Sequence, residues 1–148
     1  MQGTLQVACW DEEESGLIGS RAFAQRAAAE GARYDAVYSL DMIAFTDNMP
    51  GAQGLPSNLE LLFPEQVERL AQHDFKADFI PVSANQSAGA HAEAFVRYAQ
   101  DISLMAIPFV IYGGMELHPL LSDFGRSDHA PFWEHGYPGL FISDTAEL

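Results

Sequence analysis

The spacing of apolar residues changes several times along this chain, and each change predicts an element. Compact runs of apolar, β-branched and aromatic residues bounded by Gly, Pro or acidic residues are typical of strands. Such runs lie at 5–10, 34–45, 79–82, 108–112 and 139–143. Apolar residues that recur every three or four positions predict helices. That spacing is found at 16–30, 64–72 and 90–102, and a short helical turn is expected at 127–136.

The order of these elements indicates the class of fold. A strand, a helix and a second strand follow one another within residues 5–45, which is the pattern of a βαβ crossover. The segment 46–57 that comes next is rich in Gly, Pro, Asn and Asp and predicts a long loop, which is usually functional inside a compact domain. A chain of about 150 residues buries roughly 70% of its unfolded surface. We therefore expect one α/β domain.

Acidic residues dominate the charge of the chain. Its 7 Lys and Arg residues stand against 21 Asp and Glu residues, which gives a formal net charge of −14. Without a basic face the chain is not expected to bind nucleic acid or an anionic membrane, whereas cationic ligands and metal ions fit its charge. The longest apolar run, 104–112, contains Pro108 and is well short of the ~20 residues of a membrane-spanning helix. The single cysteine, Cys9, allows no internal disulfide and no cysteine-based zinc cluster.

Four consecutive acids, Asp11 to Glu14, follow the first expected strand and precede the first expected helix. Adjacent carboxylates repel one another, so a folded chain keeps them together when they are solvated, when they cap a helix, or when a cation neutralises them. Taken alone, the run favours an acidic helix N-terminus, because acids there are stabilised by the helix dipole.

A second acid, Asp41, comes before Met42 near the end of the otherwise apolar run 34–45. It can be the first residue of a loop. However, ligands of open α/β sheets bind outside the carboxyl ends of strands. A crossover would bring Asp41 to the same edge of the sheet as the acid run, and together these groups suggest an oxygen-rich metal site. Both interpretations stay open from these residues alone.

The third candidate is the pair Asp128-His129. A His beside an Asp can be a metal ligand or an oriented acid or base, but this pair also stands where a short helix begins. The cap interpretation is favoured over the ligand.

These segments resemble the zinc-dependent exopeptidases that include bacterial leucyl aminopeptidases and glutamate carboxypeptidase. Residues 10–20, Trp-Asp-Glu-Glu-Glu-Ser-Gly-Leu-Ile-Gly-Ser, are similar to their signature W-D-x-E-E-x-G-L-x-G-S. Residues 40–43, Leu-Asp-Met-Ile, match a strand end of that family. Residues 127–138 match its S-D-H-x-x-F…G-x-P segment. The three motifs stand in the right order, and the resemblance covers nearly the whole chain.

The resemblance implies a fold and a mechanism. The fold would be a three-layer α/β/α sandwich with a mixed, mostly parallel sheet. Glu13 would be the general base for a water activated by two zinc ions, Glu14 a ligand of one zinc and Asp41 a ligand of the other. Met42 would lie near the pocket for the substrate's side chain, and Asp128 and His129 would support the site. The activity implied is hydrolysis of a terminal peptide bond in a peptide with a free terminus.

The chain departs from this family in what it lacks. The family's His-x-Asp and Asp-Asn ligand motifs precede the Glu pair, and its last His ligand follows the final strand, yet none of these is present in the 148 residues. We therefore expect residues 1–148 to be an interior part of a catalytic domain, with segments missing at both ends. Each zinc would keep one of its three protein ligands, so the chain by itself is expected to bind zinc weakly and to be inactive. The parent protein, by the resemblance, could be secreted or periplasmic.

Two other functions remain open. Glutaminyl cyclases share the fold, but they carry an insertion after the Glu pair, whereas here Ser15-Gly16 follows Glu14 at once. Non-catalytic relatives use the fold for binding only and lose the carboxylates, which this chain keeps. The negative charge favours a substrate amine and hence an aminopeptidase over a carboxypeptidase.

Overall fold

The computed structural model describes residues 3–113, 121 and 123–144. Its helices are α1 (Ile18–Ala29), α2 (Pro64–Gln72), α3 (Gly89–Asp101) and α4 (Ala130–Glu134). Its strands are β1 (Val37–Leu40), β2 (Ile80–Asn85), β3 (Ala106–Ile111) and β4 (Gly139–Ile142). Short 3₁₀ turns lie at η1 (Leu59–Leu61), η2 (Gln86–Ala88) and η5 (Asp123–Gly125).

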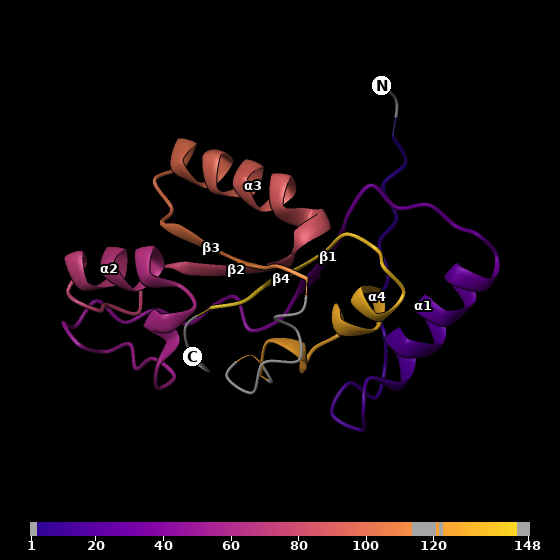
Figure 1. The fold of residues 1–148 in the computed structure, drawn as a ribbon, viewed down its shortest axis with the longest axis horizontal. Helices are drawn as coiled ribbons and strands as arrows, with labels where there is room; N and C mark the ends of the chain where they lie inside the picture. Colours follow the sequence, from indigo (N-terminus) through magenta and orange to yellow (C-terminus); the bar gives the residue numbers. More distant parts are fainter. Residues whose placement is uncertain (1–2, 114–120, 122, 145–148) are drawn as a thin grey trace.

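The four described strands form one mixed sheet in the order β1-β4-β2-β3 (Figure 1). β1 pairs with β4 in parallel, β2 pairs with β3 in parallel, and β2 runs antiparallel to β4. The carboxyl ends of β1 and β4 therefore meet the amino end of β2 at one edge. This junction is where the polar residues that follow β1 and β4 come together.

Two hydrophobic clusters cover the two faces of the sheet. Alternate residues of β3 divide between them: Ile107, Phe109 and Ile111 pack with α2 and η1, whereas Ala106 packs with α3. This alternation follows from the two-residue period of a strand. In Figure 1 α3 lies above the sheet and α2 lies at the end where β2 and β3 begin. The result is the three-layer α/β/α arrangement that the resemblance implies.

The helices α1 and α4 pack on each other at the other end of the molecule (Figure 1). Trp10 lies 5.7 Å from Phe23 of α1 and 5.5 Å from Phe132 of α4, measured between ring centroids. An exposed ion pair between Arg21 and Glu134, 2.5 Å apart, joins the same two helices. Aromatic contacts of this kind bury large apolar area, so they attach α1 to the body of the fold.

Several expected elements are confirmed. The helix at 64–72 has the bounds predicted for it, because Pro64 provides a preorganised first turn and Arg69 suits its carboxyl end. The helices at α1 and α3 and the last strand are also present within one or two residues of their expected bounds. Gly31, which follows α1, has a φ of 68°, the left-handed conformation that favours glycine at a helix end.

Two expectations about the first third of the chain were wrong. Residues 5–10 belong to no strand: Leu5 and Val7 are 88% and 84% exposed, and the segment pairs with no strand that the structure describes. The predicted βαβ crossover is therefore not formed, and α1 packs on α4. The strand expected at 34–45 is shortened to Val37–Leu40, because Met42 has a φ of 49° and turns the chain away from the sheet. Among the described residues, no helix has the length and apolar character to cross a membrane.

Candidate functional site

A cavity of about 480 Å³ opens at the edge of the sheet where β1 and β4 end. It gathers three of the acids singled out in the sequence with residues from the 46–57 loop, from β2, from the η5 region and from the end of β4. Its walls are formed by Glu13, Glu14, Asp41, Met42, Gly54, Leu55, Pro56, Pro81, Ser83, Phe124, Arg126, Ser127, Phe141, Ser143 and Asp144.

Backbone carbonyl groups of the acidic run, not its carboxylates, cap α1. The carboxylates of Glu13 and Glu14 can therefore line the cavity. The carbonyl oxygens of Glu12 and Asp11 accept hydrogen bonds from the amides of Ile18 and Gly19 at 3.3 and 3.1 Å, and the carbonyl of Glu13 closes the turn before the helix by accepting from Leu17 at 2.9 Å. No side chain caps the helix, and no acid lies in its first turn. The carboxylates of Glu13 and Glu14 are therefore not used for capping, which removes the simplest explanation of the acid run.

Close backbone contact makes this arrangement possible. A Cβ atom on Gly19 would come within 2.8 Å of the amide nitrogen, carbonyl oxygen and Oδ1 of Asp11, so only glycine leaves room for the loop there. Glu12, one residue before Glu13, has a φ of 54°, in the left-handed region where non-glycine residues are strained. Such strain is found most often at functional sites.

Glu13 is the member of the acid run with the most perturbed environment. Partial burial raises its pKa, and the negative charges of Glu14, Asp128 and Asp41 raise it further, while a hydrogen bond with Ser127 lowers it. Each of these carboxylates therefore makes Glu13 a stronger base than an isolated glutamate. A base of this kind, open to a cavity, suits proton transfer.

Asp41 reaches the same cavity from a turn that follows β1. The amide of Asp41 donates to the carbonyl of Ile142 at 3.2 Å, which continues the pairing of β1 with β4 by one residue. Met42 then turns the chain, and both Asp41 and Met42 line the cavity. Glu13, Glu14 and Asp41 thus line one cavity, although the route that brings Glu13 and Glu14 there is not the expected crossover.

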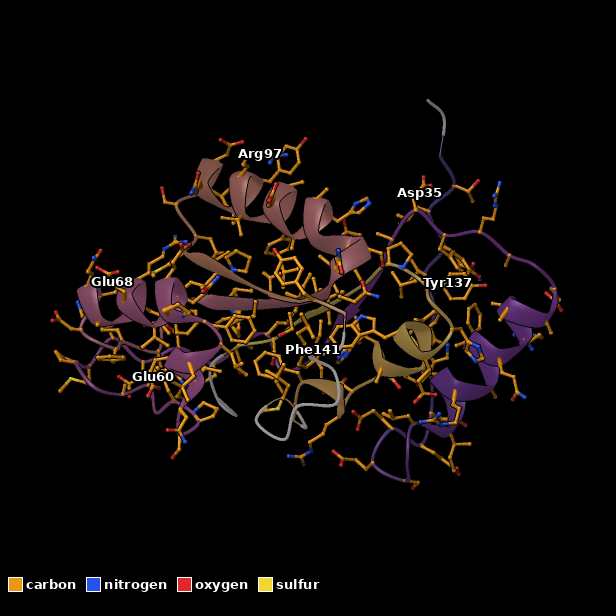
Figure 2. All side chains as sticks on the ribbon, viewed as in Figure 1. Asp35, Glu60, Glu68, Arg97, Tyr137 and Phe141 are labelled. Carbon is orange, nitrogen blue, oxygen red and sulfur yellow. The ribbon has the colours of Figure 1, made fainter. Side chains whose placement is uncertain are left out.

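The pair Asp128-His129 lies behind the wall of the cavity. Asp128 is near enough to Glu13 to raise the pKa of Glu13, and the Oδ1 of Asp128 is buried with no hydrogen-bond partner among the described residues. His129 is fully buried; its Nε2 lies 2.6 Å from the carbonyl oxygen of Phe124, and its ring stacks on Phe141 at 4.8 Å. Figure 2 shows Phe141 in the middle of the molecule.

Burial lowers the pKa of His129 to about 4, despite the opposing hydrogen bond with Phe124. His129 is therefore neutral at pH 7, with Nε2 donating to the Phe124 carbonyl. His129 is the N-cap residue of α4, but its side chain makes no hydrogen bond that caps this helix. Its imidazole contacts the carbonyl of Phe124 and the ring of Phe141, two residues that line the cavity.

Glu14 and Asp41 fit a divalent metal in the kind of ligand they offer. Carboxylate oxygens bind zinc, and both groups open into the same cavity. Within residues 3–113, 121 and 123–144, no three His, Cys, Asp or Glu side chains are grouped to hold a metal ion. Glu14 and Asp41 alone are fewer than the three protein ligands that zinc takes in catalytic sites.

Two cavity residues were missed by the sequence analysis. Ser127 was considered only within its motif, yet it bonds with Glu13. Asp144 is buried, and its Oδ2 accepts hydrogen bonds from the amides of Ala44 and Phe45 at 3.0 and 2.7 Å. A polar residue directly after a predicted strand was a usable signal for Asp144, by the same rule that drew attention to Asp41.

Comparison with known proteins finds similarity along nearly the whole chain. The sequence matches the model of peptidase family M28 over residues 1–147, a range that includes every residue of the cavity. It is 27% identical over 112 residues to the uncharacterized protein YfbL of Escherichia coli (strain K12). That alignment covers 73% of this chain and 29% of YfbL, so the chain spans less than a third of the relative's length.

Proposed function

Since this chain belongs to peptidase family M28, we propose that it carries the carboxylate side of the active site of a zinc-dependent, aminopeptidase-like exopeptidase. The observation that supports this most directly is the convergence of Glu13, Glu14 and Asp41, from two separate loops, on one cavity. The whole protein would cleave the terminal bond of a peptide that has a free terminus.

Each carboxylate has a distinct role in this proposal. Glu14 and Asp41 would each hold one of two zinc ions. Zinc ions, when bound, polarise a scissile carbonyl and acidify water. Glu13 would receive the proton on its carboxylate, because its pKa is raised by burial and by the neighbouring acids, and later donate that proton to the leaving amine. Ser127 would keep the Glu13 carboxylate oriented through their hydrogen bond.

The other walls of the cavity suit a substrate with a free amine and an apolar side chain. Four acids, Glu13, Glu14, Asp41 and Asp144, outnumber Arg126 among the described lining residues, so the cavity has a net negative field, which attracts a cation. Apolar surface is contributed by Leu55, Pro56, Met42, Phe124 and Phe141. This combination supports the aminopeptidase over the carboxypeptidase.

The test replaces the proposed base in the protein expressed from its native gene. We expect Glu13→Gln to lower kcat/KM for an aminoacyl dye by about 10²- to 10⁴-fold, because Gln cannot accept the proton. Glu12→Gln is the matched control: Glu12 is the exposed preceding acid and does not line the cavity. Chelation should abolish the activity and added Zn²⁺ should restore it. Full activity of Glu13→Gln, or of the chelated protein, would contradict the proposal.

A further inference from the structure

The turn that carries Asp41 into the cavity is held by the segment that follows β4. The carboxylate of Asp144 accepts hydrogen bonds from the amides of Ala44 and Phe45 through the same oxygen, Oδ2, at 3.0 and 2.7 Å. The amide of Asp144 donates to the carbonyl of Met42 at 2.5 Å. Three of the backbone groups after Asp41 are thus paired with one residue.

The turn needs such a partner because its own geometry is unfavourable. Met42 has a φ of 49°, and Met42, Ile43 and Phe45 are 42%, 53% and 49% exposed, so little hydrophobic burial stabilises the turn. Asp144, by contrast, is only 4% exposed. A buried carboxylate that accepts backbone hydrogen bonds is among the stronger polar contacts in a protein.

The parallel pairing of β1 and β4 explains how Asp144 comes to this place. Leu40 is opposite Ile142 in the register, so the residues that leave the two strands travel together past the edge of the sheet. The side chain of Asp144 then meets the amides of the turn, while Asp144 itself also lines the cavity.

We infer that Asp144 is a positioning residue: by clamping the turn 42–45, its buried carboxylate aims Asp41 into the cavity as a metal ligand. This inference rests on the proposed function for the role of Asp41. The clamp itself rests on the hydrogen bonds of Asp144 alone.

Two substitutions separate the geometry of the clamp from its charge. Asp144→Ala removes the acceptor for Ala44 and Phe45. Asp144→Asn keeps an oxygen that can accept both hydrogen bonds but removes the negative charge. Asp101→Ala is the matched control, because Asp101 is an exposed acid at the end of α3 and does not line the cavity.

The first measurement is amide hydrogen exchange by NMR on the protein expressed from its native gene. We expect Asp144→Ala to lower the protection of the Ala44 and Phe45 amides by about tenfold or more, the ratio equivalent to one lost charge-assisted hydrogen bond. Asp144→Asn should lower the protection of these two amides less than Asp144→Ala does, because its neutral oxygen still accepts both hydrogen bonds. In Asp101→Ala their protection should stay within about threefold of the wild type. Equal protection in all four proteins would overturn the clamp.

The second measurement is titration of the same proteins with Mn²⁺, followed by paramagnetic broadening of the amides near Asp41. Mn²⁺ suits carboxylate ligands, and broadening detects weak binding. We expect Asp144→Ala to weaken the Mn²⁺ affinity by about tenfold and Asp144→Asn by much less. Equal weakening in both variants would show that charge, not position, matters and would overturn the inference. If wild-type signals near Asp41 do not broaden at all, the proposed metal function fails while the exchange result still decides the clamp.

Discussion

The two loops that bring carboxylates into the cavity are held in opposite ways. The loop that carries Glu13 and Glu14 is held by backbone bonds to the start of α1, only three to eight residues further along the chain. The turn that carries Asp41 is held by Asp144, about 100 residues away. Both contain a non-glycine residue in the left-handed region, Glu12 and Met42. The first loop can thus form together with its helix, whereas the second depends on long-range folding.

This difference also separates backbone from side chain within the first loop. Its backbone is fixed locally, but the Glu13 carboxylate is oriented by Ser127, which lies more than 100 residues later in the sequence. A residue that is remote in the sequence, Ser127, therefore orients a carboxylate and lowers its pKa, although the loop that carries this carboxylate is held by local contacts. In the second loop remote residues build the backbone itself.

We expect the largest effect on the free energy of unfolding from His129, a buried residue that supports the segments behind both loops. His129 stacks on Phe141 of β4 and bonds to the Phe124 carbonyl, three residues before Ser127. Its pKa in the folded protein, about 4, is below the ordinary value of about 6.5, so the unfolded chain binds more protons between these values. Above about pH 7 the titration of His129 therefore no longer changes the free energy of unfolding. This free energy should fall by about 3 kcal/mol as the pH drops from 6.5 to 4.

Urea unfolding between pH 7 and pH 4 measures this loss. His129→Gln cannot titrate, so its free energy of unfolding should be lower at pH 7 but should change less with pH than that of the wild type. Parallel pH profiles for the two proteins would show that His129 is not buried as described.

A smaller effect is expected from a substitution that disturbs only the loop that carries Glu13 and Glu14. Gly19→Ala would bring its Cβ within 2.8 Å of the backbone of Asp11. We expect this substitution to lower the free energy of unfolding by about 2 kcal/mol, because a tightly packed backbone cannot give way cheaply. Gly89→Ala in α3 is the matched control: its Cβ would meet only Val110 at an ordinary 3.6 Å, and the helix should gain up to about 1 kcal/mol. Denaturant unfolding of both variants measures the two changes. If the free energy of unfolding rises equally in both variants, the close contact of Gly19 with Asp11 is absent.

The smallest effect is expected from substitutions at the left-handed residue of each loop, which compare the backbone strain of the two loops directly. Glu12→Gly and Met42→Gly each relieve a left-handed conformation, at the cost of a more flexible unfolded chain. We expect each to raise the free energy of unfolding by about 0.5 kcal/mol. In hydrogen exchange the Glu12→Gly loop should keep the protection of the Leu17 amide, because its partners are local. A loss of stability in either variant would show that the left-handed conformation carries no strain.

The sequence predicted local features of this protein better than remote ones. The helix at 64–72 was predictable because its start, its apolar positions and its terminal charges all lie within nine residues. The strand predicted at 5–10 is not formed. A strand needs a neighbouring strand to pair with, and the residues of the segment do not specify which strand that would be. Leu5 and Val7 have the alternation of a strand, yet they contact no ladder that the structure describes.

The same division holds within the candidate site. Glu13, Glu14 and Asp41 were found because contiguous motifs carry them. Asp144 was not found, since its importance depends on the pairing of β1 with β4, which brings it to the turn after Asp41. Nor could the sequence show that carbonyl groups, rather than the acids themselves, cap α1.

The position of β4 has a consequence for the order in which this chain folds during synthesis. β4 is the last described strand in the sequence, but it lies between β1 and β2. Nascent chains leave the ribosome amino end first, and contacts between distant residues form late. β1 therefore has no described strand to pair with until residues 139–142 emerge and pair with it. A chain truncated or stalled before that point would hold the Glu pair on its helix but would leave Asp41 on an unpaired, aggregation-prone strand.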